Sequence, residues 1–73
     1  MGKRKMRLTN RIRECRMNRG GMTQQELADI VGVTRQTVNA IESNKYSPSL
    51  EVAFLIARTL GAHIEDVFGV EES

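Results

Sequence analysis

The sequence predicts a compact, all-α single domain of five helices, in which the second and third helices form a helix-turn-helix. Three observations predict this fold. Residues 23–31 open on a helix-start signal, residues 35–43 follow after a tight turn, and apolar residues along the chain recur at helical spacing. Two short helices that meet through a turn of three or four residues have the geometry of a helix-turn-helix. A chain of 73 residues has room for one such domain.

Residues 1–8 are expected to form an extended, mobile, basic arm. Residues 1–20 carry eight basic side chains and one acid (8 − 1 = +7), whereas residues 21–73 carry three basic side chains and eight acids (3 − 8 = −5). Such an asymmetry is typical of a basic edge that faces a polyanion. A solubilising tail explains residues 3–5 equally well.

The first helix is predicted over about residues 10–19, with Thr9 as its N-cap. Its apolar positions are sparse and include Ile12 and Cys15. We interpret Cys15 as a small buried hydrophobe rather than a reactive thiol, because free cysteine is among the most buried residue types. Gly20-Gly21 is expected to end this helix.

The second helix is predicted to begin with a capping box, in which Thr23 accepts from the Glu26 N–H and Glu26 reaches back to Thr23. Leu27, Ala28 and Val31 form its apolar face. Gly32 is expected to end it, since glycine adopts positive φ without a steric penalty.

Thr34 is a good N-cap for the third helix, residues 35–43. Val38 and Ile41 fall on one side of this helix. The opposite side presents Arg35, Gln36 and Asn39, with Ala40 beside them.

The fourth helix is predicted from Ser49 to about Leu60, after a polar loop in which Asn44 adopts a left-handed conformation. Its core positions are Val52, Ala53, Ile56, Ala57 and Leu60. A short fifth helix is predicted at 64–68, with His63 near its N-cap. Residues 70–73 form an acidic tail, so the helical domain is expected to span 9–69.

Together these segments resemble the lambda-repressor/Cro-like helix-turn-helix family, also called the XRE family, over about residues 9–69. The matching features are Thr23-Gln24, Glu26-Leu27-Ala28, Gly32-Val33, Thr34-Arg35-Gln36-Thr37-Val38, Ile41-Glu42, Lys45, Pro48-Ser49-Leu50, Leu60-Gly61 and Ile64-Glu65-Asp66-Val67-Phe68. The resemblance implies a five-helix domain that binds double-stranded DNA. It does not imply which gene is regulated.

The third helix carries side chains suited to reading bases. In a helix-turn-helix this recognition helix lies in the major groove, with its N-terminal residues against base edges. Arginine binds guanine and glutamine or asparagine binds adenine, each pair contributing about 1–3 kcal/mol of discrimination. We therefore expect Arg35, Gln36 and Asn39 to read bases and Ala40 to touch a thymine methyl. The alternatives are a solvated face and, for Asn39, a phosphate contact.

Phosphate contacts are expected around the recognition helix. Gln24 begins the second helix, where free N–H groups and the helix dipole favour an anion. The resemblance implies that Gln24 binds a phosphate and braces the recognition helix. The further phosphate candidates are Thr34, Thr37, Ser43, Lys45 and Tyr46, and for Tyr46 packing is an equal alternative.

The resemblance also implies an internal ion pair between Arg16 and Glu42, which would fix the recognition helix against the first helix. Removing one partner of such a buried pair leaves a buried charge alone.

A homodimer is expected, because one recognition helix reads only a few base pairs and two-fold dimers read half-sites roughly 34 Å apart. The apolar residues assigned to the interface are Phe54, Leu55, Ile64, Val67, Phe68 and Val70. The alternative is that they complete the core of one chain. The basic arm and the tail at 69–71 are expected to pair as short strands, which brings opposite charges together.

The composition offers no catalytic or metal-binding set. The chain has one cysteine, Cys15, and one histidine, His63, which is too few for a structural zinc site. His63 is interpreted as a surface cap. We expect no enzyme activity, metal, cofactor or small-molecule ligand. No run approaches the roughly 18 apolar residues of a membrane span, and a lone cysteine fits a reducing compartment. A cytoplasmic, nucleoid-associated protein is therefore expected.

The function expected is that of a transcriptional regulator, a repressor, which binds a palindromic operator as a homodimer. One alternative is a protein-interaction module, such as an antitoxin or coactivator, with secondary DNA binding. Another is a nonspecific nucleoid-type binder held by the arm at 3–7.

Overall fold

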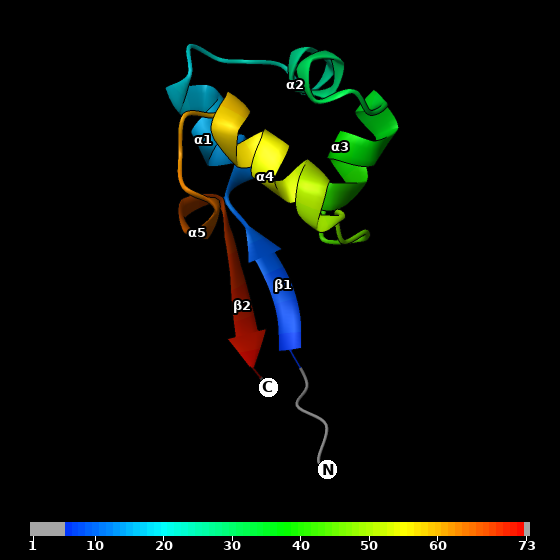
Figure 1. The fold of residues 1–73 in the computed structure, drawn as a ribbon, viewed down its shortest axis with the longest axis vertical. Helices are drawn as coiled ribbons and strands as arrows, with labels where there is room; N and C mark the ends of the chain where they lie inside the picture. Colours follow the sequence, from blue (N-terminus) through cyan, green and yellow to red (C-terminus); the bar gives the residue numbers. More distant parts are fainter. Residues whose placement is uncertain (1–5, 73) are drawn as a thin grey trace.

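The structure, a computed structural model, describes residues 6–72 and contains five helices and a two-stranded sheet (Figure 1). The helices are α1 (Ile12–Asn18), α2 (Gln24–Val31), α3 (Arg35–Glu42), α4 (Leu50–Thr59) and α5 (Ile64–Val67). The strands are β1 (Met6–Asn10) and β2 (Phe68–Glu72). The first five residues of the expected basic arm lie outside the described residues.

One hydrophobic core joins all five helices. Its fully buried side chains are Ile12, Leu27, Val38, Ile41, Ile56 and Val67. Every helix contributes at least one of them, because each helix is too short to be stable alone and requires an apolar face packed on its neighbours. Cys15 is only half-buried at the edge of this core, so its expected burial is partial.

The helix boundaries follow the expected caps closely. Thr23, Thr34 and Ser49 each accept a hydrogen bond from the backbone N–H three residues ahead, at the start of α2, α3 and α4. Gly32 has a φ of 89° at the end of α2. Asn44 has a φ of 61° after α3, as expected for a left-handed cap.

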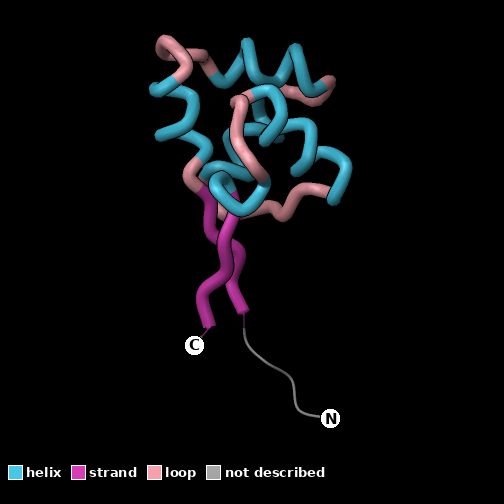
Figure 2. The backbone as a smooth tube through the Cα atoms, turned by 60° about the vertical axis from the view of Figure 1, so that its left-hand side comes forward, coloured by secondary structure: helices cyan, strands magenta, loops and turns pink. Residues whose placement is uncertain are grey.

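The expectation of an all-α fold is only approximately right, because β1 and β2 pair antiparallel, with Leu8 opposite Val70. The resulting ribbon projects from the helical domain (Figures 1 and 2). Arg7 lies opposite Glu71, and their side chains form an ion pair of 2.9 Å. The expected pairing of arm and tail, with opposite charges together, is thus confirmed. The description of residues 6–8 as a free arm was wrong.

The first helix starts later than expected. Thr9 lies in β1 and does not cap α1. Instead, Asn10 Oδ1 accepts a hydrogen bond of 3.1 Å from the Ile12 N–H, so the helix begins at residue 12. At the other end of the chain, Phe68 is extended and begins β2, which shortens the predicted fifth helix by one residue.

Candidate nucleic-acid interface

The recognition helix α3 is amphipathic and presents its polar face to solvent. Val38 and Ile41 are buried against the core. Arg35, Gln36 and Asn39 are exposed, and Ala40 is half-buried. Among residues 6–72, no hydrogen bond restrains the side chains of Arg35 and Gln36, so both are available to an external ligand.

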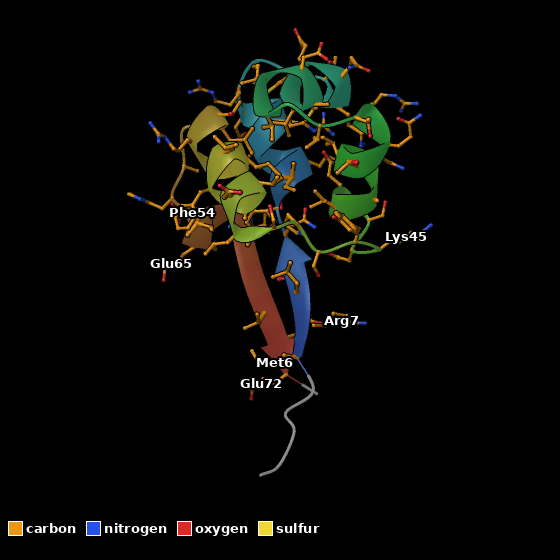
Figure 3. The ribbon with its side chains drawn as sticks, turned by 45° about the vertical axis from the view of Figure 1, so that its right-hand side comes forward. Met6, Arg7, Lys45, Phe54, Glu65 and Glu72 are labelled. Carbon is orange, nitrogen blue, oxygen red and sulfur yellow. The ribbon has the colours of Figure 1, made fainter. Side chains whose placement is uncertain are left out.

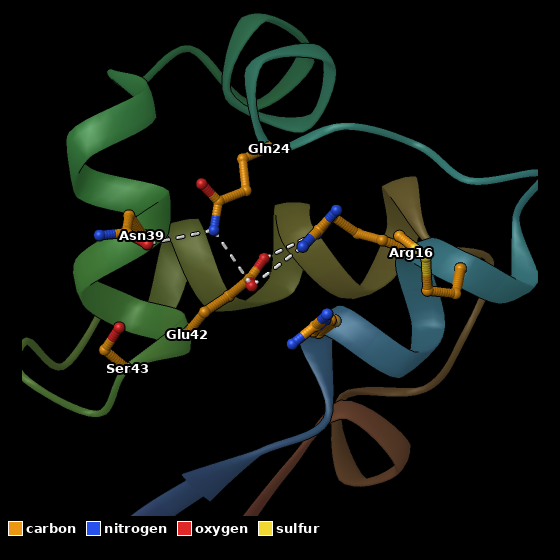
Figure 4. A pocket seen from close by; sticks show the side chains of 7 residues that line it. Arg16, Gln24, Asn39, Glu42 and Ser43 are labelled. Carbon is orange, nitrogen blue, oxygen red and sulfur yellow. Dashed lines mark hydrogen bonds and ion pairs between the residues drawn. The ribbon is translucent and has the colours of Figure 1, made fainter.

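A buried ion pair holds α3 against α1 (Figure 4). Arg16 donates from Nε to Glu42 Oε2 at 2.7 Å and from a terminal nitrogen to Glu42 Oε1 at 3.1 Å. It also donates to the Met22 carbonyl oxygen at 2.7 Å. The two charged side chains are 8% and 9% exposed. The expected pair is therefore present in the two-bond geometry that gives arginine–carboxylate contacts their specificity.

Gln24 extends this network to the exposed face of α3. Its amide nitrogen donates to Glu42 Oε1 at 3.2 Å and to Asn39 Oδ1 at 3.3 Å, as Figure 4 shows. A glutamine amide has two N–H donors, so both are in use. The Gln24 side chain thus braces Asn39 and retains only acceptor capacity outward. Its backbone N–H, like that of Gln25, lies in the first turn of α2 and has no partner within the helix.

Asn39 is oriented by this contact. Its Oδ1 accepts from Gln24, which leaves both N–H groups of its Nδ2 available as donors. Asn39 is therefore arranged to donate to an acceptor outside the protein.

Two threonine hydroxyls lie at the start of α3. Thr34 Oγ1 accepts from the Thr37 N–H at 3.1 Å, and the two hydroxyl oxygens are 3.0 Å apart. Two hydroxyls that share one hydrogen bond retain one proton to donate elsewhere. The remaining phosphate candidates, Ser43, Lys45 and Tyr46, are all exposed at or beyond the end of α3. Lys45 extends into solvent in Figure 3.

A cleft of about 450 Å³ separates the faces of α1 and α3, and Gln24, Asn39 and Ser43 contribute to its lining. Arg13 lines the same cleft from α1. Arg13 is exposed and has no ion pair with another residue of 6–72. The sequence analysis did not assign it a contact. Its spacing from Arg16, one helical turn earlier, was the available signal.

The residues assigned to a dimer interface fall into two groups. Phe54, Leu55 and Val70 are 48%, 44% and 57% exposed, and Ile64 and Phe68 are half-buried at the core edge. Val67, in contrast, is 1% exposed. Its assignment to an interface was wrong, because the side chain points into the core of its own chain.

Two further searches of the described chain gave negative results. No three metal-ligating side chains lie together within residues 6–72. No helix in that range is long and apolar enough to cross a membrane.

The capped α2–turn–α3 unit, packed in a five-helix core with a polar, exposed α3, defines a helix-turn-helix protein. The family model described as helix-turn-helix matches residues 12–67, which include all five helices. The chain therefore belongs to the lambda-repressor/Cro-like helix-turn-helix family of transcriptional regulators.

Relatives occur in archaea and bacteria, and each is named an uncharacterized HTH-type transcriptional regulator. One from Methanothermobacter thermautotrophicus is 58% identical over 62 residues, covering 84% of this chain and 88% of the relative. One from Archaeoglobus fulgidus is 52% identical over 61 residues, covering 84% and 86%. YgzD from Bacillus subtilis is 46% identical over 65 residues, covering 89% and 97%. The similarity thus extends along almost the whole of each protein.

Proposed function

We propose that this protein is a sequence-specific, double-stranded-DNA-binding repressor that acts as a homodimer on a palindromic operator, with α3 in the major groove. The observation that carries the proposal is the contrast along α3. Its apolar face is locked in the core, while Arg35 and Gln36 have no intramolecular hydrogen bond within residues 6–72. Side chains of this type match the donor and acceptor pattern of base edges in the major groove.

Base readout is assigned to Arg35, Gln36 and Asn39, with Ala40 against a thymine methyl. Arg35 and Gln36 lie in the first turn of α3, the part of a recognition helix that reaches base edges. Asn39 differs from them, because Gln24 already occupies its oxygen. We assign Asn39 a donor role toward an acceptor such as purine N7.

Phosphate contacts surround this reading face. For Gln24 we assign the contact to the backbone N–H, because both side-chain donors are engaged. Helix N-termini bind anions through such free N–H groups. The other phosphate contacts are assigned to Thr34, Thr37, Ser43, Lys45 and Tyr46, and we add Arg13 at the mouth of the α1–α3 cleft.

Dimerisation is assigned to the surface of α4, α5 and β2. Its apolar side chains are Phe54, Leu55, Ile64, Phe68 and Val70. An apolar groove of about 430 Å³, lined by Leu8, Phe68 and Val70 among others, is continuous with this surface. Phe54 and Lys45 lie on opposite sides of the domain in Figure 3. A second copy bound at Phe54 therefore leaves the phosphate-facing end of α3 open.

Repression is the direction we propose, because a small domain that occupies an operator blocks transcription without a further activity. The proposed location is the cytoplasm, at the nucleoid. No cofactor enters the proposal.

The test selects random duplex DNA with the purified protein and sequences the bound fraction. We expect a palindrome with half-site centres about one helical turn, roughly 34 Å, apart. Sedimentation equilibrium with and without this duplex should give two protein chains per site. Selection of no motif would contradict the proposed function.

Two variants then separate base reading from phosphate binding, and each removes one positive charge. Arg35→Ala should lower discrimination by about 1–3 kcal/mol per half-site and relax the preference at one base position. Lys45→Ala should weaken operator and scrambled DNA alike and reduce the salt dependence by about 0.9 per contact. Equal effects of both substitutions on the two DNAs would count against direct readout by Arg35.

A further inference from the structure

Asn10 connects the β ribbon to the end of the recognition helix. It is the last residue of β1 and lies opposite Phe68 of β2. Its Nδ2 donates to the Ile41 carbonyl oxygen at 3.0 Å and to Asn44 Oδ1 at 2.9 Å, with a longer contact of 3.3 Å to the Glu42 carbonyl oxygen. Its Oδ1 accepts from the Ile12 N–H at 3.1 Å. One side chain therefore contacts β1, α1, α3 and the loop that follows α3.

The orientation of this amide follows from its partners. All three groups on one side, two carbonyl oxygens and the Asn44 oxygen, are acceptors, so the amide nitrogen must face them. The group on the other side is an N–H, which requires the amide oxygen. A residue with both a donor and an acceptor on a short side chain is needed here, and no carboxylate or hydroxyl reproduces the full set.

The contacts matter because they fall where a helix lacks its own restraints. The last carbonyl groups of a helix have no partner in the following turn. In α3 these carbonyls belong to residues that directly follow the base-reading segment. Asn10 restrains two of them from a position more than 30 residues away in sequence.

The base of the ribbon is itself fixed to the helical domain. The Arg11 N–H donates to the Val67 carbonyl oxygen at 2.7 Å, next to the pairing of Asn10 with Phe68. The ribbon projects into solvent, and a two-stranded ribbon alone has marginal stability in water. Ordering the ribbon and holding the end of α3 therefore share the same residue.

We propose that Asn10 is a positioning residue for base recognition, which couples the β ribbon to the placement of the recognition helix. This inference rests on the proposed function, because it names a further determinant of the same DNA specificity. Asn10 does not touch DNA in this proposal. It acts through the carbonyl groups at the end of α3.

The competing explanation is that Asn10 only caps α1. Two substitutions separate the roles. Asn10→Asp and Asn10→Ser both retain an oxygen for the Ile12 N–H, and both are good N-cap residues. Aspartate presents no donor to α3, and serine is too short to reach it. Capping alone thus predicts two variants that resemble the wild type.

The experiment measures affinity for the selected operator and for a scrambled duplex of the same length. We expect Asn10→Ser and Asn10→Asp to lower the ratio of the two affinities by roughly tenfold, as expected for the loss of one or two hydrogen bonds. Asn18→Asp is the matched control for the added charge, since Asn18 is exposed on α1. That control should weaken both DNAs alike and leave the ratio unchanged. An unchanged ratio in both Asn10 variants would overturn the proposal.

A second readout does not depend on DNA. The amides of Ser43, Asn44 and Lys45 donate to the carbonyls of Asn39, Ile41 and Ala40 at 2.9–3.0 Å. In Asn10→Ser these amides should exchange with solvent faster, while those of α2 keep the wild-type rate. Unaltered exchange would overturn the coupling even if the wild type proves to have no operator. A wild type without sequence preference, but with faster exchange in the variant, would contradict the proposed function and retain the coupling.

Discussion

The Arg16–Glu42 pair offers a quantitative test of how the recognition helix is held. The perturbation is a double-mutant cycle of Arg16→Met, Glu42→Leu and the combination, in which both charges are replaced by apolar side chains. Either single variant leaves one charge in a site where the wild-type side chains are 8% and 9% exposed. Breaking a buried pair in this way costs about 3–5 kcal/mol, because the remaining charge has lost its partner.

The structure places each single variant within that range, toward its lower end. In Glu42→Leu the arginine retains the Met22 carbonyl as one acceptor at 2.7 Å. In Arg16→Met the carboxylate retains the Gln24 amide at 3.2 Å. We therefore expect each single variant to lose about 3 kcal/mol. The combined variant buries no charge and should lose less than either single variant.

Such losses are large for a domain of this size. At about 0.05–0.15 kcal/mol per residue, 73 residues correspond to a free energy of unfolding of roughly 4–11 kcal/mol. A loss of about 3 kcal/mol lowers the midpoint of thermal unfolding by roughly 12–24 °C.

The assay is urea unfolding followed by far-ultraviolet circular dichroism, because the chain has no tryptophan. Arg11 and Glu14 supply the control cycle, since they form an ion pair of 3.3 Å with side chains 68% and 66% exposed. That cycle should give a coupling of at most about 0.5 kcal/mol. If the losses at Arg16 and Glu42 simply add in the combined variant, the account of a buried, mutually dependent pair is wrong.

Two further predictions concern the backbone and the ribbon. Gly32→Ala should destabilise the domain by about 1–2 kcal/mol, because φ is +89° and an added Cβ meets no atom within 4 Å, so only the left-handed backbone is penalised. Thermal unfolding measures this, Gly32→Asn should lose less, and an alanine variant of wild-type stability would refute the reasoning. Arg7→Gln should change the free energy of unfolding by less than about 1 kcal/mol, because the ion pair with Glu71 is 76% and 59% exposed. The small effect should vanish at high salt, and a loss that persists at high salt would show that the pair is not merely a surface contact.

Local signals in the sequence determined most of the helical fold. The capping box of Thr23 and Glu26, the N-cap threonine at 34 and the left-handed residues Gly32 and Asn44 all lie where the sequence predicts them. Each depends on atoms within a few residues of one another, so the order of residue types alone is sufficient. The alternation of apolar and polar faces along α3 likewise predicted which side chains meet solvent.

The tertiary structure alone decided the features that join distant parts of the chain. Residues 6–10 have no strong strand signal, and they form β1 because the folded core brings them beside residues 68–72. The same closure moved the start of α1 from residue 10 to residue 12. It also placed the Asn10 amide on α3, which no local pattern indicates.

Burial divided residues that the sequence treats as equivalent. Val67 and Val70 are both apolar and near the end of the chain, but Val67 is in the core and Val70 is exposed. Gln24 was expected to brace α3 and to bind phosphate, and the geometry commits both of its amide donors to the brace. Hydrogen-bond donors and buried volume are limited, and how they are shared depends on which side chains meet in three dimensions. The sequence therefore determined the helices and their faces, whereas the packed structure decided which side chains remain free to bind a partner.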